Sequence, residues 1–304
     1  GGSIILTNYQ HELYFAHCHG HPKKPLEIYM FVDPLCPECW SLEPVIKKLK
    51  IRYGRFFTLR IIASASLTAL NKKRKKHLLA EAWEKIASRS GMSCDGNVWF
   101  EQDQPLSSPY MAALAFKAAE LQGRKAGMQF LRNMQESLFV SKKNITDENV
   151  LLEIAENTSL DLEEFKKDLH SQSAVKALQC DMKIAAEMDV SVNPTLTFFN
   201  TQHEDEGLKV PGSYSYDVYE EILFEMLGDE PKPSETPPLE CFIEYFRFVA
   251  SKEIALVYDL SLEEVEKEMK KLAFAKKVAK VEAKHGMFWK SLSTYSDEYQ
   301  SCEK

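Results

Sequence analysis

A Cys-x-x-Cys motif directly follows a short apolar segment and precedes a helical pattern. Residues 26–32 are rich in β-branched and aromatic side chains, which is typical of a strand, and Asp33-Pro34 ends the run. Cys36 and Cys39 follow, and the next apolar residues recur at helical spacing, with Pro44 expected in a first helical turn or at a kink. Unpaired N–H groups and the helix dipole stabilise a thiolate at such a helix start. The pattern therefore predicts redox-type geometry.

The segments beyond this motif alternate between strand and helix patterns. Residues 56–62 read as a second strand, so strand, helix and strand form a βαβ unit of a parallel sheet. Residues 72–190 read as a long helical insertion, and strands resume at 195–199, just after Pro194, with a last strand and turn at 208–212. This order predicts an α/β, thioredoxin-like fold. In such folds a cis-proline packs beside the cysteines, and Pro194 is the candidate for that position.

The chain divides by composition into four parts. Residues 1–25 form a His/Cys-rich arm, and residues 26–228 hold the sheet and its insertion. Residues 229–238 contain four prolines, which favours an extended, semi-rigid linker. Residues 239–304 follow the order helix, helix, turn, helix and hairpin. We therefore predict a small winged-helix-like α+β domain after the linker.

The arm carries the donor types of a transition-metal site at His17, Cys18, His19 and His21. Structural zinc takes four ligands in a tetrahedron, and adjacent residues rarely all reach one ion. Two interpretations therefore stay open, a metal-binding arm and a polar arm without metal. For the Cys-x-x-Cys motif a zinc site is disfavoured, because the sequence has no second pair of this kind.

Charge and hydropathy limit the classes of partner. The net charge is -7, and acidic residues crowd the start of the helix near residue 263, which opposes DNA binding. The basic run 71–77 is expected to be a solvated loop or helix end. No apolar run reaches the roughly 18 residues that span a bilayer. An odd number of scattered cysteines and the lack of an apolar signal-peptide core predict a cytoplasmic protein with no membrane contact.

The segment from Met30 to Leu49, MFVDPLCPECWSLEPVIKKL, resembles the SpxH/YjbH adaptor family, which has a DsbA-like thioredoxin fold. The His/Cys-rich arm and the appended C-terminal block fit the same family. The resemblance implies an adaptor that binds the transcription regulator Spx and promotes its degradation by the ClpXP protease in disulfide stress. It also implies zinc at His17, Cys18, His19 and His21, with no other cofactor required.

Two functions of different classes follow. The first is the adaptor, a binding protein and not an enzyme. The second is a cytosolic DsbA-like thiol–disulfide oxidoreductase that uses Cys36 and Cys39 with Pro194 beside them. Glu38 stands where DsbA-type oxidases usually have a histidine, and an anion there disfavours the thiolate. The adaptor is therefore the preferred prediction. The surface that meets Spx, direct contact with ClpX and the oligomeric state stay open.

Overall fold

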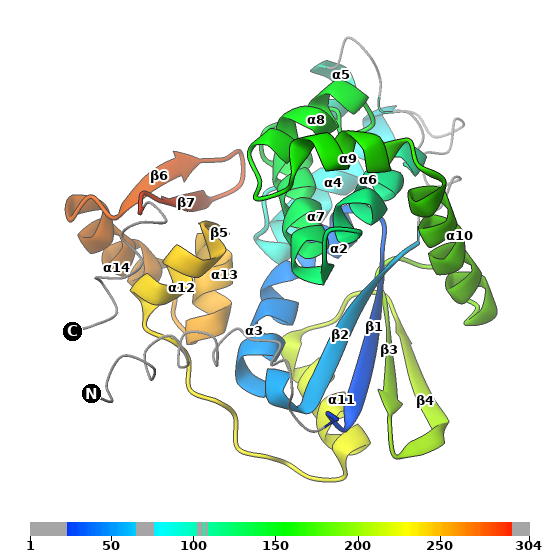
Figure 1. Ribbon diagram of the computed structural model, residues 1–304. Coiled ribbons are helices and arrows are strands. Elements are labelled where there is room, and N and C mark those ends of the chain that lie inside the picture. The colour runs from blue at the N-terminus through cyan, green and yellow to red at the C-terminus, as the bar shows by residue number, and fades with distance from the viewer. Residues whose placement is uncertain (1–22, 65–75, 102–105, 107–108, 294–304) are drawn as a thin grey trace, which may run out of the picture.

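The computed structural model describes residues 23–64, 76–101, 106 and 109–293. Four strands form one sheet in the order β2-β1-β3-β4 (Figure 1). β1 and β2 are parallel, and both other pairs are antiparallel. The strands are β1 (Leu26–Val32), β2 (Phe57–Ala63), β3 (Thr195–Asn200) and β4 (His203–Pro211). The sequence predicts all four, although β4 begins earlier than the expected 208.

β1 is one of the two inner strands, and its side chains suit burial on both faces of the sheet. Its first residues alternate between buried and half-buried, and Met30 to Val32 are all buried. Helices α3 (Glu43–Tyr53) and α11 (Tyr216–Leu227) contact each other on one side, and Phe31 packs with α10 (Gln172–Glu187) on the other. The end of β1 is thus held firmly from both sides, and the Cys-x-x-Cys motif starts there.

The long helical insertion between β2 and β3 covers the end of the sheet near the motif (Figure 1). Its α6 is buried from Ala112 through Ala119, because small alanines let neighbouring helices approach closely. The described helices of the insertion run from Lys76 to Glu187, within the predicted 72–190. They are α4 (Lys76–Ser90), α5 (Val98–Glu101), α6 (Tyr110–Glu120), α7 (Arg124–Phe139), α8 (Glu148–Glu156), α9 (Leu162–Leu169) and α10.

The C-terminal block, residues 239–293, has its own three-stranded sheet in the order β5-β7-β6. Its predicted helices and hairpin are present, and the additional strand β5 pairs with β7. The sequence did not indicate β5, because three residues are too short to show a strand pattern. The elements are α12 (Leu239–Phe246), β5 (Phe248–Ala250), α13 (Ser251–Tyr258), α14 (Leu262–Phe274), β6 (Val278–Glu282) and β7 (Met287–Ser291).

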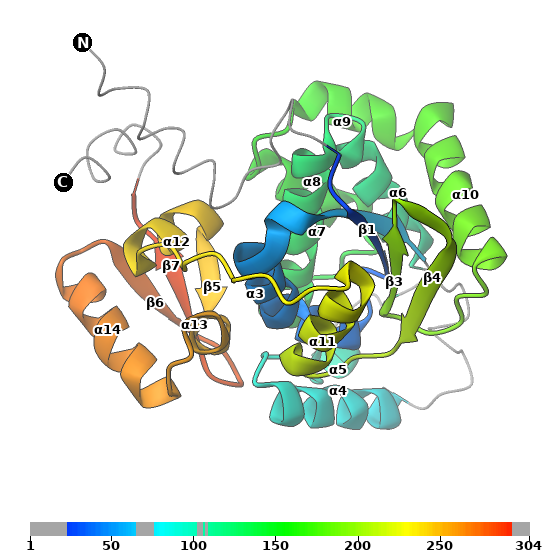
Figure 2. The ribbon, with the colours of Figure 1, turned by 90° about the horizontal axis from the view of Figure 1, so that it is seen from below.

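The proline-rich segment that connects the larger part of the molecule to the C-terminal block is hydrogen-bonded to the larger part. Arg52 and Ser234 exchange two hydrogen bonds of 2.8 Å: the Ser234 N–H donates to the Arg52 carbonyl, and the Arg52 guanidinium donates to the Ser234 carbonyl. Beyond it, α13 packs on α3, and Ile51 of α3 belongs to the apolar core of the C-terminal block (Figure 2). The C-terminal block is therefore fixed against the larger part of the molecule.

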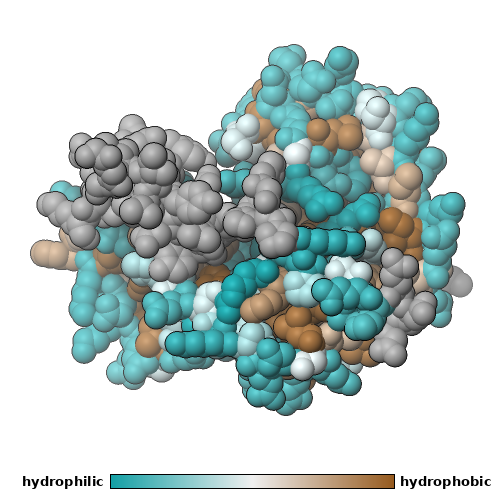
Figure 3. Space-filling view, turned by 60° about the horizontal axis from the view of Figure 1, so that its bottom comes forward, coloured by the Kyte–Doolittle hydropathy of each residue, from teal (hydrophilic) through white to brown (hydrophobic). Residues whose placement is uncertain are grey.

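In the described part of the chain, no helix is both long enough and apolar enough to cross a bilayer. Figure 3 shows one face of the molecule, in which hydrophilic residues predominate and apolar patches are small. The apolar side chains gather instead in the interior, where β1, α3, α6, α7 and the hairpin β6–β7 meet.

Candidate functional site

A tight turn after β1 presents the first cysteine. The N–H of Cys36 donates to the carbonyl of Asp33 at 3.0 Å, and the N–H of Leu35 donates to Oδ1 of Asp33 at 2.9 Å. Cys36 then acts as the N-cap of α2 (Pro37–Ser41), whose first position is a proline that needs no hydrogen-bond acceptor. Leu42 ends α2 and Pro44 stands in the first turn of α3, as predicted. The sequence Asp-Pro-Leu-Cys-Pro therefore sets the position of the motif locally.

The two cysteines have different surroundings. Cys36 is half-buried, and its Sγ lies 3.5 Å from the carbonyl oxygen of Asn193. Cys39 lies one turn later and is 1% exposed. Burial raises the pKa of the Cys39 thiol well above its ordinary value, and the adjacent Cys36 raises it further. Both are free thiols. Only Cys36 can therefore meet a partner molecule directly.

Pro194 lies beside Cys36, as the sequence predicts. The peptide bond between Asn193 and Pro194 is cis, and the Pro194 carbonyl accepts a hydrogen bond of 2.8 Å from the N–H of Gly212. The side chain of Asn193 donates to the carbonyl of Ser64 at 2.8 Å, which anchors the loop to the end of β2. Cys36, Cys39 and Pro194 thus form one site at the end of the sheet.

Glu38 does not stand as an uncompensated anion beside Cys36. Its carboxylate accepts a hydrogen bond of 2.5 Å from the guanidinium of Arg89 on α4. The sequence suggested that Glu38 would disfavour a thiolate, and the Arg89 cation opposes part of that effect. The two residues are 51 positions apart, so only the fold reveals the pair.

Asp33 is a buried carboxyl within this site. It is 1% exposed, and burial raises its pKa to about 6, although the hydrogen bond from Leu35 acts in the opposite direction. Its charge is close enough to Cys39 to oppose ionisation of that thiol. An ionised Asp33 and a Cys39 thiolate therefore disfavour each other, whereas a neutral carboxyl relieves the repulsion.

Trp40, the residue after Cys39, is fully buried and supports the C-terminal block. Its indole stacks against Phe288 of β7 at a centroid distance of 6.3 Å and against Phe139 of α7 at 5.8 Å. The indole N–H donates to the carbonyl of Ser93 at 2.8 Å. The motif helix is therefore in contact with the C-terminal block through its second half. Nothing local in the sequence indicated this partner.

A buried ion cluster reinforces the same junction. Arg132 of α7 binds Glu253 of α13 through two hydrogen bonds of 2.6 and 3.0 Å, and its guanidinium lies 4.6 Å from the ring centre of Trp40. Lys47 of α3 also pairs with Glu253, which is fully buried. Burial opposes ionisation of Glu253, but Arg132 and Lys47 overcome it and hold its pKa down to about 2. Burial raises the pKa of the neighbouring Glu136 to about 7, despite its contact with Arg132.

The tip of the hairpin β6–β7 provides a third contact between the two parts. His285 pairs with Glu84 of α4 through Nε2, and its Nδ1 lies 3.4 Å from both Ser93 Oγ and the N–H of Cys94. Lys284 binds Glu84 at 2.5 Å. Ser93 is 1% exposed, so this Ser, His and Glu group is not positioned to attack a substrate. It is a structural contact of the hairpin.

The predicted metal ligands fall elsewhere. His17, Cys18, His19 and His21 lie outside the described residues, and zinc there stays a prediction from the resemblance. Among the residues that the structure does describe, no group of three or more His, Cys, Asp or Glu side chains is arranged to hold a metal ion.

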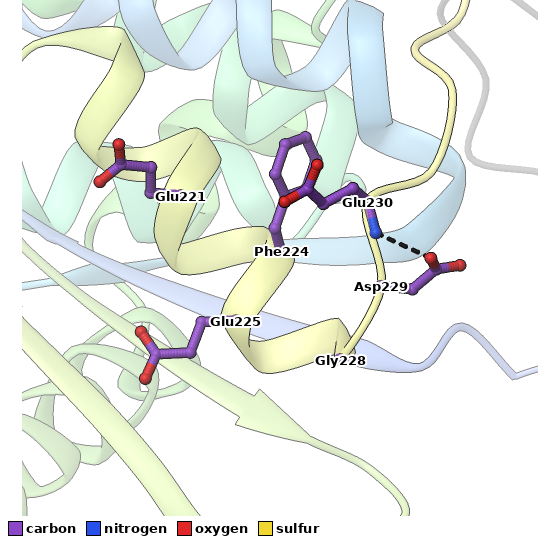
Figure 4. A pocket seen from close by; sticks show the side chains of 6 residues that line it. All are labelled: Glu221, Phe224, Glu225, Gly228, Asp229 and Glu230. Carbon is purple, nitrogen blue, oxygen red and sulfur yellow. Dashed lines mark hydrogen bonds between the residues drawn. The ribbon is translucent and has the colours of Figure 1, made fainter.

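A surface cavity of about 380 Å³ lies at the C-terminal end of α11 (Figure 4). Asn200, which pairs with Leu26 at the start of β1, binds the carbonyl of Met226 in the same turn of α11. The cavity is therefore at the opposite end of β1 from Cys36, and we assign it no part in the site. Its lining is mostly acidic and consists of Glu221, Phe224, Glu225, Gly228, Asp229 and Glu230.

Solved structures share the architecture of the larger part. The cytosolic disulfide reductase DsbM from Pseudomonas aeruginosa aligns with a TM-score of 0.53 at 15% identity, covering 66% of this chain and 99% of that one. A protein from Nitrosomonas europaea, assigned as a disulfide isomerase, aligns with a TM-score of 0.59 at 17% identity, covering 68% and 98%. At such identities the likeness shows the fold alone. It confirms the predicted DsbA-like thioredoxin fold.

Sequence relatives match nearly the whole chain. A family model described as Thioredoxin matches residues 29–221. A Bacillus licheniformis protein named ClpXP adapter protein SpxH is 72% identical over 98% of this chain and 100% of its own length. A Halalkalibacterium halodurans protein of the same name is 48% identical over 89% of this chain and 90% of its own length. The chain therefore belongs to the SpxH family, whose larger part is a DsbA-like thioredoxin fold.

Proposed function

We propose that this protein is a cytoplasmic ClpXP adaptor that binds Spx and promotes its degradation. The observation that carries the proposal is the 72% identity over 98% of the chain with a protein named ClpXP adapter protein SpxH. An identity that spans arm, thioredoxin-like part and C-terminal block includes every surface on which a shared partner could bind. Spx as the client comes from the sequence resemblance.

The surroundings of the motif helix support a binding role. Cys39 is 1% exposed and burial raises its thiol pKa, while the next residue, Trp40, stacks against Phe288 of the C-terminal block. A resolving cysteine acts as a thiolate, so a raised pKa slows that step. The block that covers Trp40 is held by the buried Arg132 and Glu253 pair. The motif helix therefore serves here as a support for an added surface.

A reconstituted degradation assay tests the proposal. Purified ClpXP degrades Spx in the presence and absence of the full chain, and a second ClpXP substrate unrelated to Spx serves as the specificity control. We expect faster loss of Spx and an unchanged rate for the control substrate. The double variant Cys36→Ala/Cys39→Ala should retain most of the stimulation. An Spx degradation rate that does not respond to the protein contradicts the adaptor function.

A second candidate function is thiol–disulfide exchange, because Cys36 is accessible beside Pro194. The Cys36 thiolate would attack a substrate disulfide and release one substrate thiolate. Cys39 would then attack the mixed disulfide, release the second thiolate and leave a Cys36–Cys39 disulfide, which an external dithiol reduces. Turnover of a disulfide substrate with dithiothreitol, abolished by Cys36→Ala, is the expected signature. A wild-type rate equal to the dithiothreitol background excludes this function.

A further inference from the structure

Two arginines at the end of α3 hold the proline-rich linker through a single serine, where the linker crosses that helix (Figure 2). The Arg52 guanidinium donates to the Ser234 carbonyl at 2.8 Å, and the Ser234 N–H donates to the Arg52 carbonyl at 2.8 Å. Arg55, in the short helix η1 (Gly54–Phe56), donates to the Ser234 hydroxyl and to the carbonyl of Lys232. The serine backbone is therefore fixed, and its hydroxyl oxygen faces a guanidinium group.

Neither arginine has an acidic partner. In the described part of the chain, Arg52 and Arg55 form no ion pair, and the atoms that accept from them are carbonyl and hydroxyl oxygens. The chain has 45 acidic and 38 basic residues, so a shortage of carboxylates does not explain this. The Arg55 guanidinium also lies 4.4 Å from the ring centre of Phe56, which restricts its orientation. The arginine pair thus has the donors of an anion site, while its acceptors are uncharged.

A neighbouring phenol responds to the charge of the arginine pair. Burial raises the pKa of Tyr53, and Glu220 of α11 raises it further, whereas Arg52 and Arg55 act in the opposite direction. Glu220 acts on the same phenol, but its carboxylate forms no ion pair with either arginine among the residues that the structure describes. The positive charge of the two guanidinium groups is therefore available to an anion on the linker.

A phosphoryl group on the Ser234 hydroxyl matches these donors. Phosphoserine carries roughly 1.5–2 negative charges at neutral pH and three strong acceptor oxygens. Guanidinium groups bind such oxygens through charge-assisted hydrogen bonds, often two at a time. Because the hydroxyl oxygen already accepts from Arg55, a phosphorus atom bonded to it lies beside that guanidinium. Arg52 binds the same serine through its carbonyl and adds a second cation nearby.

The segment around Ser234 is suited to a modifying enzyme. Residues 230–238 form neither helix nor strand, and the exposed Lys232 and Glu235 lie close to the serine on either side. Ser234 itself is half-buried. A segment without secondary structure opens locally at a low free-energy cost, so the hydroxyl can reach the active site of an enzyme.

We propose that Ser234 is a phosphorylation site whose phosphoryl group is bound by Arg52 and Arg55. A protein kinase transfers the γ-phosphoryl group of a nucleoside triphosphate. The bond to the departing nucleoside diphosphate breaks, a bond to Oγ of Ser234 forms, and the hydroxyl proton passes to the kinase or to solvent. The inference does not rest on the proposed adaptor function.

Phosphorylation at this position bears on how the two parts of the molecule are held together. The hydroxyl of Tyr258 in α13 donates to the carbonyl of Pro237 at 2.6 Å, so the C-terminal block also holds the linker. Charge-assisted bonds from Arg52 and Arg55 strengthen the attachment of the same linker to the larger part. A phosphorylated Ser234 therefore fixes the C-terminal block more firmly against α3.

Phosphorus NMR of the full chain tests the anion site. The two proteins compared carry Ser234→phosphoserine or, as the matched control, Thr236→phosphoserine, which lies in the same linker two residues farther on. An ordinary phosphoserine has a second pKa of about 6. We expect the titration midpoint at position 234 to be about one pH unit lower than at 236, because nearby cations favour the dianion. Arg55→Gln, at an exposed side chain, should remove most of this difference. Equal midpoints at the two positions overturn the proposed site.

Hydrogen exchange of the linker amides, followed by mass spectrometry, measures the effect on the linker. We expect about tenfold slower exchange after Ser234→phosphoserine than in the unmodified chain, and no such change after Thr236→phosphoserine. Inorganic phosphate added to the unmodified chain distinguishes a free anion from a bound phosphoryl group. If free phosphate at millimolar concentration gives the same protection, the arginine pair is a site for the free ion, and the modification is overturned.

Phosphopeptide mapping of the protein isolated from its own cells tests the modification itself. The protein is taken from growing cells and from cells under disulfide stress, and its linker peptide is analysed by mass spectrometry. We expect phosphate on Ser234 in at least one of the two conditions. A linker without phosphate in both conditions, or with phosphate only on Thr236, overturns the proposal.

Discussion

The two sides of the short helix α2 differ although they are only a few residues apart. On one side, Cys36 is half-buried beside the cis-proline Pro194 and the exposed Val192, as a site that meets an extended chain requires. On the other side, Cys39 and Trp40 are buried against other parts of the molecule. The first side resembles a redox protein, and the second is a packing surface.

The packing side uses charges where a core ordinarily uses apolar groups. Glu253 of the C-terminal block is fully buried between Arg132 and Lys47, and both of its oxygens are hydrogen-bonded. Buried ion pairs give little net stability compared with apolar groups, but their geometry is specific. The comparison teaches that the Cys36 side of α2 keeps the form of a redox site, whereas the packing side of α2 holds the C-terminal block in one orientation.

The largest loss of stability is expected when the buried ion pairs of Glu253 are broken. Glu253→Gln removes the carboxylate that pairs directly with both Arg132 and Lys47, and Glu43 and Glu136 then compensate the two cations only in part. Breaking one partner of a buried pair costs about 3–5 kcal/mol of unfolding free energy. Urea unfolding followed by circular dichroism measures the loss. Asp259→Asn is the control, because its pair with Lys48 has a 77% exposed carboxylate and contributes at most about 1 kcal/mol. Equal small losses in both variants would refute a structural role for the buried pair.

A smaller effect on the free energy of unfolding, with a defined pH dependence, is expected for Asp33, which lies in the turn before α2. Its pKa of about 6 in the folded protein exceeds the ordinary 3.8, so the folded state binds the proton more tightly than the unfolded state. Wild-type stability should therefore fall as pH rises from about 4 to above 6. Asp33→Asn does not ionise and should be more stable than wild type by about 1–3 kcal/mol at pH 8, with the gain lost near pH 4.

Urea unfolding at pH 4, 6 and 8 measures this difference. The exposed Asp217→Asn is the control, for which no comparable slope is expected. The comparison of the two sides of α2 is sharpened by this variant, because Asn keeps the oxygen that caps the Leu35 N–H and changes only the charge near Cys39. An Asp33→Asn curve parallel to wild type at all three pH values would show that the pKa of Asp33 is not raised in the folded protein.

The Cys36 side of α2 was predictable from the sequence, and the packing side was not. The strand before Cys36, the proline in α3 and Pro194 all come from local patterns, because a short apolar run, a helix-breaking residue and an X-Pro bond each act within a few positions. Helix periodicity likewise indicated the insertion. In contrast, Arg132 and Glu253 are 121 residues apart, and no local pattern of charge links them.

Trp40 illustrates the same limit. The sequence marks it as an apolar residue at the start of a helix, but many other aromatic side chains that are buried in the described part of the chain could pack against it equally well. Its stacking on Phe288 depends on where the linker lets the C-terminal block dock. The pairing of Glu38 with Arg89 was missed for the same reason, and it changes the electrostatics expected at Cys36.

The smallest change in the free energy of unfolding is expected for replacement of the two cysteines, and these variants allow a direct comparison of the two sides of α2. Cys36→Ala should change the unfolding free energy by no more than about 0.5 kcal/mol, whereas Cys39→Ala should cost about 1 kcal/mol, since only the second opens a gap in packed surroundings. Iodoacetamide labelling followed by peptide mass spectrometry should modify Cys36 well before Cys39, with the exposed Cys180 as an internal standard. Equal labelling rates for Cys36 and Cys39 would mean that the packing around Cys39 opens readily in solution. In that case the packing side of α2 would also be accessible to reagents, and the contrast between the two sides would hold in only one conformational state of the protein.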